Sequence, residues 1–248
     1  MLGIVVSLPW ELKTLTRQGI RVGTCRRISD DTWVALSGIG AERAHAASDL
    51  LLSRGATALL SWGCAAALDD GLRPGGVILP GRVISVTGES YPVSVEWHRR
   101  LYQTLSAEYS VRTDALLESA TILNTPEVKR TLAQRTQAIA TDMESGAQAR
   151  LARARRMPFV AVRVVVDTAS AQIPDNVLRA LDSSGDINMR SCLARAILRP
   201  ADGIATMKLS MQFNAARKTM KKASALVLDA SRIYLTCLSA SSTATERL

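Results

Sequence analysis

The stretch FVAVRVVVD, residues 159–167, is a strongly apolar, valine-rich run that ends in an aspartate. Such a run is typical of a strand that is buried on both faces of a sheet, as in parallel α/β proteins. Ligands of open α/β sheets bind at the carboxyl ends of these strands. We therefore expect the Asp167 carboxyl group to emerge from apolar surroundings at a candidate site.

Similar valine- and isoleucine-rich segments alternate with alanine-rich amphipathic segments along the chain, which predicts an α/β domain with buried strands. The expected strands cover residues 3–7, 32–37, 57–63, 76–79, 137–140 and 159–166. The expected helices cover residues 41–53, 94–108, 126–134 and 143–156, and a helical region follows residue 190. We predict a catalytic domain over 1–190, a basic helical extension over 191–238 and a frayed tail over 239–248.

Composition excludes several classes of protein. The chain has 248 residues, of which 47% are hydrophobic and 21% charged, so it is a packed globular protein and not a disordered one. No apolar stretch approaches the roughly 20 residues needed to cross a bilayer. The first residues lack the basic segment and cleavage site of a secretory signal, so we expect a cytoplasmic protein.

Metal and cofactor motifs are missing from the sequence. Four cysteines lie far apart, and only two histidines could join them, so disulfide and zinc frameworks are not expected. The segment GIGAER, residues 38–43, has Arg43 where a dinucleotide-binding fingerprint needs its third glycine. P-loop, nucleophile-elbow and His-Glu-x-x-His motifs are absent too. We expect neither a metal nor an organic cofactor.

Three acidic residues follow or flank expected strands: Glu11, Glu144 and Asp167. Burial would raise the pKa of Asp167, and a protonated carboxyl group can serve as a general acid; the alternative is an aspartate that caps the next turn. Glu144 has an alternative as well, because TDME at 141–144 fits a capping box for the following helix. Glu11 could be an ordinary first-turn acid that the helix dipole favours.

Five segments in order resemble the purine nucleoside and uridine phosphorylase superfamily, and their spacing is similar to that of its nucleosidase branch, which includes methylthioadenosine/adenosylhomocysteine nucleosidase. They are GIVV at 3–6 with Glu11, SGIG at 37–40, GCAAAL at 63–68, DME at 142–144 and DTA at 167–169. Within the superfamily, the hopanoid-associated phosphorylases look most similar. That likeness rests on DMES at 142–145, RPG at 73–75 and LRP at 198–200.

The resemblance implies a three-layer αβα sandwich with a central mixed sheet, and cleavage of a nucleoside N-ribosidic bond. It implies that Asp167 protonates the purine ring nitrogen, that Glu144 binds ribose hydroxyls, that Met143 packs against the sugar and that Glu11 activates water. It also places four further residues at the substrate: Ser37, Gly38, Gly63 and Cys64. A homodimer is implied, with inorganic phosphate as co-substrate if the reaction is phosphorolysis.

The sequence departs from the superfamily pattern in three places. Residues 63–67 read GCAAA where the family has Gly-Ser-Ala-Gly-Gly, which predicts a tighter and drier loop. Ser61 stands where many phosphorylases have a phosphate-binding arginine, so the choice between phosphate and water stays open. Val166 replaces a serine whose hydroxyl could orient the catalytic aspartate.

The net charge of +9 is concentrated near the C-terminus, because residues 190–222 hold eight basic side chains against Asp202 alone. An apolar stripe at helical spacing accompanies them: Leu209, Phe213, Ala216, Met220, Ala223 and Val227. A basic amphipathic helix can lie on an anionic membrane, here the inner face of the cell membrane. The alternative is a helix docked on the core with a solvated basic face. No nucleic-acid-binding motif accompanies the charge.

The leading hypothesis from the sequence is an enzyme of hopanoid biosynthesis that releases adenine from adenosylhopane, a lipid-linked nucleoside, by attack of phosphate or water. A second hypothesis is a nucleosidase for methylthioadenosine or adenosylhomocysteine. A third is a decayed enzyme that survives as a membrane-associated binding protein. The persistence of Glu11, Glu144 and Asp167 argues against the third.

Overall fold

The computed structural model describes residues 1–172 and 200–245, with the backbone alone for 200–209 and 239–245. The domain boundary predicted at residue 190 lies outside the described residues. The strands are β1 (Leu2–Val6), β2 (Thr24–Ser29), β3 (Thr32–Leu36), β4 (Ala58–Ala67), β5 (Val77–Ile78), β6 (Arg82–Ile84), β7 (Ser90–Pro92), β8 (Val111–Arg112), β9 (Leu116–Glu118), β10 (Ala140–Asp142) and β11 (Phe159–Asp167). The helices are α1 (Pro9–Leu15), α2 (Ala41–Ser53), α3 (Val95–Ser106), α4 (Pro126–Thr136), α5 (Ser145–Ala154) and α8 (Pro200–Thr245).

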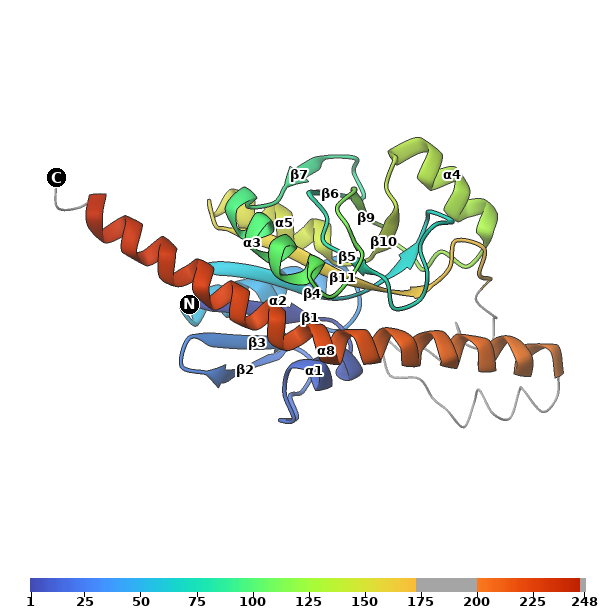
Figure 1. Cartoon of the computed structure of the whole chain (residues 1–248), viewed down its shortest axis with the longest axis horizontal. Coiled ribbons are helices and arrows are strands. Elements are labelled where there is room, and N and C mark those ends of the chain that lie inside the picture. The colour runs from blue at the N-terminus through green and yellow to red at the C-terminus, as the bar shows by residue number, and fades with distance from the viewer. Residues whose placement is uncertain (173–199, 246–248) are drawn as a thin grey trace.

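One mixed sheet forms the centre of the molecule (Figure 1). Strand β1 pairs in parallel with β3 and β4, and β4 pairs in parallel with β11. Strand β10 runs antiparallel to β4 and joins it to the outer strands β9, β6 and β7. Every residue of β1 and β11 is buried, as expected for central strands covered on both faces.

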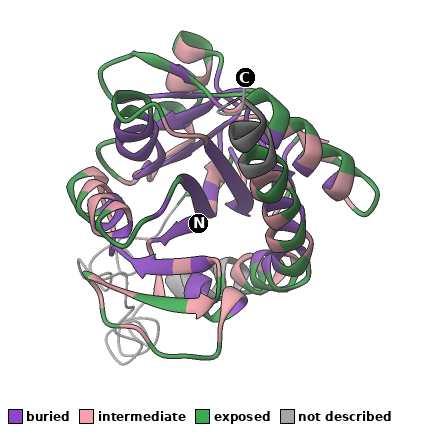
Figure 2. Cartoon of the chain, turned by 90° about the vertical axis from the view of Figure 1, so that its left-hand side faces the viewer, coloured by how far each residue is buried: buried purple, intermediate pink, exposed green. Residues whose placement is uncertain are grey.

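Helices cover both faces of the sheet. Helices α2 and α5 pack together on one face, and α1, α3 and α8 pack on the other. In Figure 2 the strands are mostly buried, while the helices turn a buried face inward and an exposed face outward. This arrangement confirms the predicted three-layer αβα sandwich with a central mixed sheet and a helical C-terminal region.

Helix α8 is docked on the body of the molecule along its middle section. Ala216, Met220, Ala223 and Val227 are fully buried, and the helix contacts α1, α3 and β11. This part of the predicted stripe therefore belongs to the core, as the alternative interpretation had it. The neighbouring basic side chains are exposed: Arg217, Lys218, Lys221 and Lys222. Within the described part of the chain, no helix is both long and apolar enough to cross a bilayer.

The predicted elements are found with shifted boundaries, and the prediction missed one helix and five strands: α1, β2, β6, β7, β8 and β9. Helix α2 has the predicted bounds, and α3 and α4 lie within two residues of theirs. Strand β4 continues to Ala67, so residues 63–67 are strand where a loop is predicted, because β10 and β11 pair with this end of β4. Helix α8 continues to Thr245, so residues 239–245, predicted as a frayed tail, are helical.

Candidate active site

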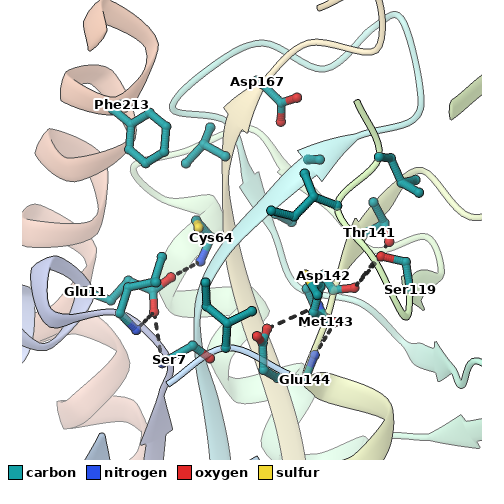
Figure 3. Close-up of a pocket in the computed structure, with 17 residues that line it drawn as sticks. Ser7, Glu11, Cys64, Ser119, Thr141, Asp142, Met143, Glu144, Asp167 and Phe213 are labelled. Atoms are coloured by element: carbon teal, nitrogen blue, oxygen red, sulfur yellow. Dashed lines mark hydrogen bonds between the residues drawn. The ribbon is translucent and has the colours of Figure 1, made fainter. Parts of the chain in front are cut away.

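A cavity lies at the carboxyl ends of β1 and β11, beside the C-terminal half of β4 (Figure 3). Four carboxyl groups line it: Glu11, Asp142, Glu144 and Asp167. Most of the remaining wall is apolar, including Leu8, Ile39, Leu123, Val166 and Phe213. Phe213 comes from α8, so the C-terminal helix contributes to this cavity. The three acids singled out in the sequence thus share one cavity.

Glu11 is held in place by backbone donors. It occupies the first turn of α1, and Oε2 accepts hydrogen bonds from the backbone N–H of Ser7 at 3.1 Å and of Leu8 at 2.9 Å. Oε1 accepts from the backbone N–H of Cys64 at 2.8 Å. A Cβ atom on Gly63 would lie 3.0 Å from Oε1, so glycine at this position leaves room for the carboxyl group. Burial raises the pKa of Glu11, and the hydrogen bonds from Cys64 oppose the rise.

Glu144 lies between β10 and α5, and its side chain reaches the turn between β3 and α2. Oε1 accepts from the backbone N–H of Gly40 at 2.9 Å, and Oε2 accepts from that of Met143 at 3.1 Å. Burial, followed by the charge of Asp142, raises the pKa of Glu144 to about 8. A carboxyl group with this pKa can change protonation near neutral pH, which suits hydrogen bonding to sugar hydroxyls as donor or acceptor.

The capping box predicted for Thr141 and Glu144 is wrong. Thr141 belongs to β10, and α5 begins only at Ser145. Asp142 caps α5 instead: its Oδ1 accepts from the backbone N–H groups of Glu144 and Ser145 and from the Ser145 hydroxyl. The Glu144 side chain is thereby released from a capping role and lines the cavity.

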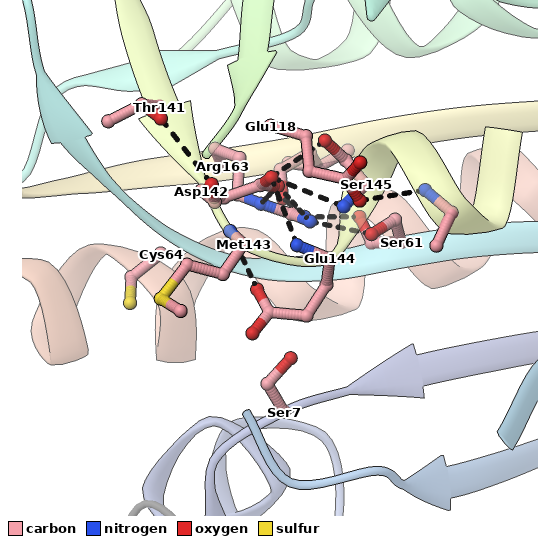
Figure 4. A network of polar contacts seen from close by, with 12 residues as sticks. Ser7, Ser61, Cys64, Glu118, Thr141, Asp142, Met143, Glu144, Ser145 and Arg163 are labelled. Atoms are coloured by element: carbon pink, nitrogen blue, oxygen red, sulfur yellow. Dashed lines mark hydrogen bonds and ion pairs between the residues drawn. The ribbon is translucent and has the colours of Figure 1, made fainter. Parts of the chain in front are cut away.

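A buried arginine that sequence reasoning missed supports this group of acids (Figure 4). Arg163 is 2% exposed and forms a two-bond ion pair with Asp142, with Nε and one terminal nitrogen 2.8 and 2.7 Å from Oδ2. Its other donors bond the backbone carbonyl oxygen and hydroxyl of Ser61. The available signal was a single charge inside the apolar run 159–166, because a buried charge requires a partner.

Asp167 lies at the end of β11, on the other side of the cavity from Glu144 (Figure 3). Its Oδ2 is 2.5 Å from Nζ of Lys129, a fully buried residue of α4 that sequence reasoning also missed. Burial raises the pKa of Asp167, and the Lys129 ammonium opposes the rise. A lysine on an amphipathic helix is usually solvated, so the sequence offers no clear signal for this pair.

The other predicted site residues divide into two groups. Met143 and Cys64 line the cavity. Burial and the Glu11 charge raise the pKa of the Cys64 thiol well above its ordinary value, which makes it a poor nucleophile. Ser37, Gly38 and Gly63 lie behind the wall: the Ser37 hydroxyl bonds backbone carbonyls, Gly38 has a φ of +81°, and Gly63 accommodates Glu11.

This arrangement suits a reaction in which positive charge develops on a sugar. Carboxylates on one side of the cavity can stabilise an oxocarbenium-like state, and a carboxyl group on the other side can protonate a leaving group. Among the described residues, the cavity lining includes no lysine or arginine.

Comparison with solved structures finds the same fold in several enzymes. Futalosine hydrolase of Helicobacter pylori superposes with a TM-score of 0.70 at 14% identity, over 92% of this chain and 97% of that one. The methylthioadenosine/adenosylhomocysteine nucleosidase of the same organism gives 0.69 at 13% identity, over 93% and 97%. The Neisseria meningitidis nucleosidase gives 0.66 at 16% identity, over 92% and 96%. At these identities the likeness shows the fold.

The family assignment comes from the sequence as a whole. No curated protein sequence matches the chain. The profile of the phosphorylase superfamily matches residues 2–199, which is most of the chain and includes every acid of the cavity. The chain therefore belongs to the phosphorylase superfamily and is an enzyme of the nucleoside phosphorylase or nucleosidase type.

Proposed function

We propose that the protein hydrolyses the bond between adenine and ribose in a nucleoside with an apolar 5′ substituent, and that this nucleoside is adenosylhopane. The observation that carries the proposal is the cavity itself, with Glu11 and Glu144 on one side, Asp167 on the other, and an apolar wall that includes Phe213. Methylthioadenosine, whose 5′ substituent is also apolar, is the second candidate, because nucleosidases for it share the fold.

Water fits this cavity better than phosphate does. Four carboxyl groups line it, and the described lining has no lysine or arginine to bind a phosphate dianion. Arg163, which lies beneath, already uses its donors on Asp142 and Ser61. Carboxylates repel an approaching anion in such a low-dielectric site, but they can accept a proton from water.

The residues divide the reaction between them. Glu11 takes a proton from water as the water oxygen bonds to the anomeric carbon. The bond between that carbon and the purine nitrogen breaks, and the ring nitrogen of adenine receives a proton from Asp167. Glu144 holds the ribose hydroxyls. General acid catalysis of this kind is typically worth about 10²- to 10⁴-fold in rate.

Helix α8 supports the choice of a lipid-linked substrate. Phe213 lines the cavity, and Arg217, one helical turn further on, begins a run of exposed basic residues that continues to Lys222. Each basic side chain near an anionic membrane contributes about 1 kcal/mol of binding. We propose that this exposed face of α8 binds the membrane surface and brings the mouth of the cavity to its substrate.

The substrate test uses purified full-length protein with three nucleosides: adenosylhopane in vesicles, methylthioadenosine and adenosylhomocysteine, each with and without inorganic phosphate. The proposal predicts adenine release from adenosylhopane with the highest kcat/KM, with the same rate in both buffers and free ribosylhopane as product. A phosphorylated ribose product would show phosphorolysis. Faster cleavage of methylthioadenosine would favour the second candidate, and no adenine from any of them would reject the proposal.

The membrane test uses charge reversal and leaves the helix in place, because the buried face of α8 belongs to the core. The double variant Lys218→Glu with Lys221→Glu should lower the fraction of protein that co-sediments with anionic vesicles. It should leave the rate of methylthioadenosine cleavage unchanged. Arg26→Glu with Arg27→Glu, exposed on β2, makes the same change in charge elsewhere. Equal loss of binding in both double variants would show that net charge alone is responsible and would reject the α8 surface.

A further inference from the structure

Lys129 is the most deeply buried charged side chain that the proposed reaction leaves without a role. It lies on α4 and is fully buried, whereas Arg130, the next residue, is exposed. Nζ donates to Oδ2 of Asp167 at 2.5 Å, to the backbone carbonyl oxygen of Thr168 at 2.9 Å and to that of Ala171 at 3.3 Å. Three acceptors match the three N–H donors of an ammonium group. The Lys129 amine is therefore enclosed by oxygen atoms that can accept its N–H groups.

The two oxygens of Asp167 have different surroundings. Oδ2 accepts from Lys129, whereas Oδ1 is buried and has no hydrogen-bond partner among the described residues. An unpaired buried acceptor costs about 1 to 3 kcal/mol, so a ligand donor there would be favourable. Because Asp167 also lines the cavity, Lys129 fixes one oxygen and leaves the other for the substrate.

This geometry raises a question about the source of the proton. Burial favours the protonated form of Asp167, whereas the neighbouring Lys129 side chain favours the ionised form, and a general acid must have a proton to give. The N–H groups of Lys129 are the donors that lie against this carboxyl group. We propose that Lys129 is a positioning residue for Asp167 that orients its carboxyl group and holds the proton that the leaving base receives; this inference rests on the proposed function.

The proton balance is simple. An N–H bond of Lys129 breaks as an O–H bond forms on Oδ2 of Asp167. The carboxyl group then rotates about its Cβ–Cγ bond to turn this O–H toward the cavity, and the proton moves to the ring nitrogen of the departing base. A carboxylate and a neutral amine remain, and solvent returns a proton to the amine. Among the described residues, Lys129 is the charged group that bears on Asp167, since Asp142, Glu144 and Arg163 gather on the other side of the cavity.

The first test is the pH profile of adenine release by Lys129→Met, measured on the fastest-cleaved nucleoside. We expect kcat to fall at least tenfold, within the range of lost general acid catalysis, with little change in KM. We also expect the alkaline limb of kcat/KM to move to lower pH, because the carboxyl group alone must then keep the proton. Arg130→Met, an exposed neighbour on α4, is the matched control. An unchanged limb in Lys129→Met would overturn the proposal.

Two further variants separate this role from a structural one. In an Asp167→Asn background, Lys129→Met should cause no further loss of kcat, because Lys129 acts through Asp167. Lys129→Arg keeps a cation and its hydrogen bonds, but a guanidinium group does not give up its proton. It should therefore restore folding stability without restoring kcat. Additive losses in the double variant, or kcat restored by arginine, would overturn the proton role.

A measurement without substrate keeps the inference separate from the proposed function. Without Lys129, the buried Asp167 carboxyl group should bind a proton in the folded state, so the free energy of unfolding of Lys129→Met should fall more steeply with rising pH than that of the unmodified protein. Adding Asp167→Asn should abolish this difference. If the difference appears but no nucleoside is cleaved, the proposed function fails and the pair stands. If the difference does not appear, the pair fails.

Discussion

The two sides of the cavity hold their carboxyl groups in different ways. On one side, Glu11 and Glu144 accept hydrogen bonds from backbone N–H groups of strand–helix turns and of β4, and the Arg163–Asp142 pair lies beneath them. On the other side, Asp167 depends on one side chain, Lys129, from α4. The first side is built into the sheet. On the second side, a proton can pass between the two members of the pair.

The two sides of the cavity suit different functions. Backbone donors stay where the fold places them, so they suit carboxyl groups that must keep one position around a sugar. A side-chain ion pair is suited to proton transfer, because either partner can carry the proton.

Asp167→Asn should lower kcat for adenine release by about 10²- to 10⁴-fold, because an amide has no acidic proton to give. The two sides should differ when the leaving group needs no protonation. Cleavage of a p-nitrophenyl riboside should survive in Asp167→Asn and be lost in Glu11→Gln, as judged by release of p-nitrophenolate. Equal losses on both substrates would show that the two sides are not divided in this way.

Arg163→Met should destabilise the protein by about 3 to 5 kcal/mol, because it leaves the Asp142 carboxylate buried without its partner. Lys129→Met should cost less, since Asp167 can take up a proton. Chemical denaturation of both variants measures the difference. A larger loss of unfolding free energy in Lys129→Met than in Arg163→Met would show that the Lys129–Asp167 pair contributes more to stability, which would contradict this contrast.

Glu144 should make stability depend on pH. Its pKa is 4.5 as a free group and about 8 when folded, so the folded state holds a proton that the unfolded state has lost between these values. Stability should therefore fall as pH rises from 4.5 to 8, by at most about 1.4 kcal/mol per pH unit from this group. Unfolding curves of Glu144→Gln should show a flatter pH dependence. An identical slope would place the titration elsewhere.

Thr125→Ala should have the smallest effect. The Thr125 hydroxyl oxygen accepts from the backbone N–H of Val128 at 3.4 Å and so caps α4, the helix that carries Lys129. Removing this long bond should cost about 0.5 kcal/mol, the low end of N-cap effects. Hydrogen exchange should rise in the first turn of α4 and stay unchanged in α5, which Asp142 caps.

The sequence predicts the parts of this site that lie at strand ends. The apolar run 159–166 places Asp167 at the end of a buried strand, and the same reasoning leads to Glu11. Helix α2 is predicted with its observed bounds because glycines stand on both sides of it. These features depend on local sequence, since an apolar strand and helix-breaking glycines can both be recognised from consecutive residues.

The rest depends on contacts between distant segments. The motif TDME at 141–144 satisfies a capping pattern, yet pairing of β10 with β4 and β9 keeps Thr141 in a strand. Lys129 and Asp167 are 38 residues apart and meet only when the folded chain brings α4 beside the end of β11. The end of β4 likewise follows from strand pairing, because the composition of GCAAA alone does not distinguish strand from loop.

The docking of α8 has a practical consequence for anyone who shortens this chain. Phe213 forms part of the cavity wall and packs edge-to-face against Trp10, the residue before Glu11. The centroids of the two rings are 5.7 Å apart. Four residues of α8 are fully buried where the helix packs on β11 and its neighbours: Ala216, Met220, Ala223 and Val227. A truncated clone that stops after the superfamily homology ends would expose apolar surface and lose one wall of its cavity. An affinity tag is better placed after the last turn of α8. Loss of activity in a C-terminal deletion variant should first be tested as a folding defect.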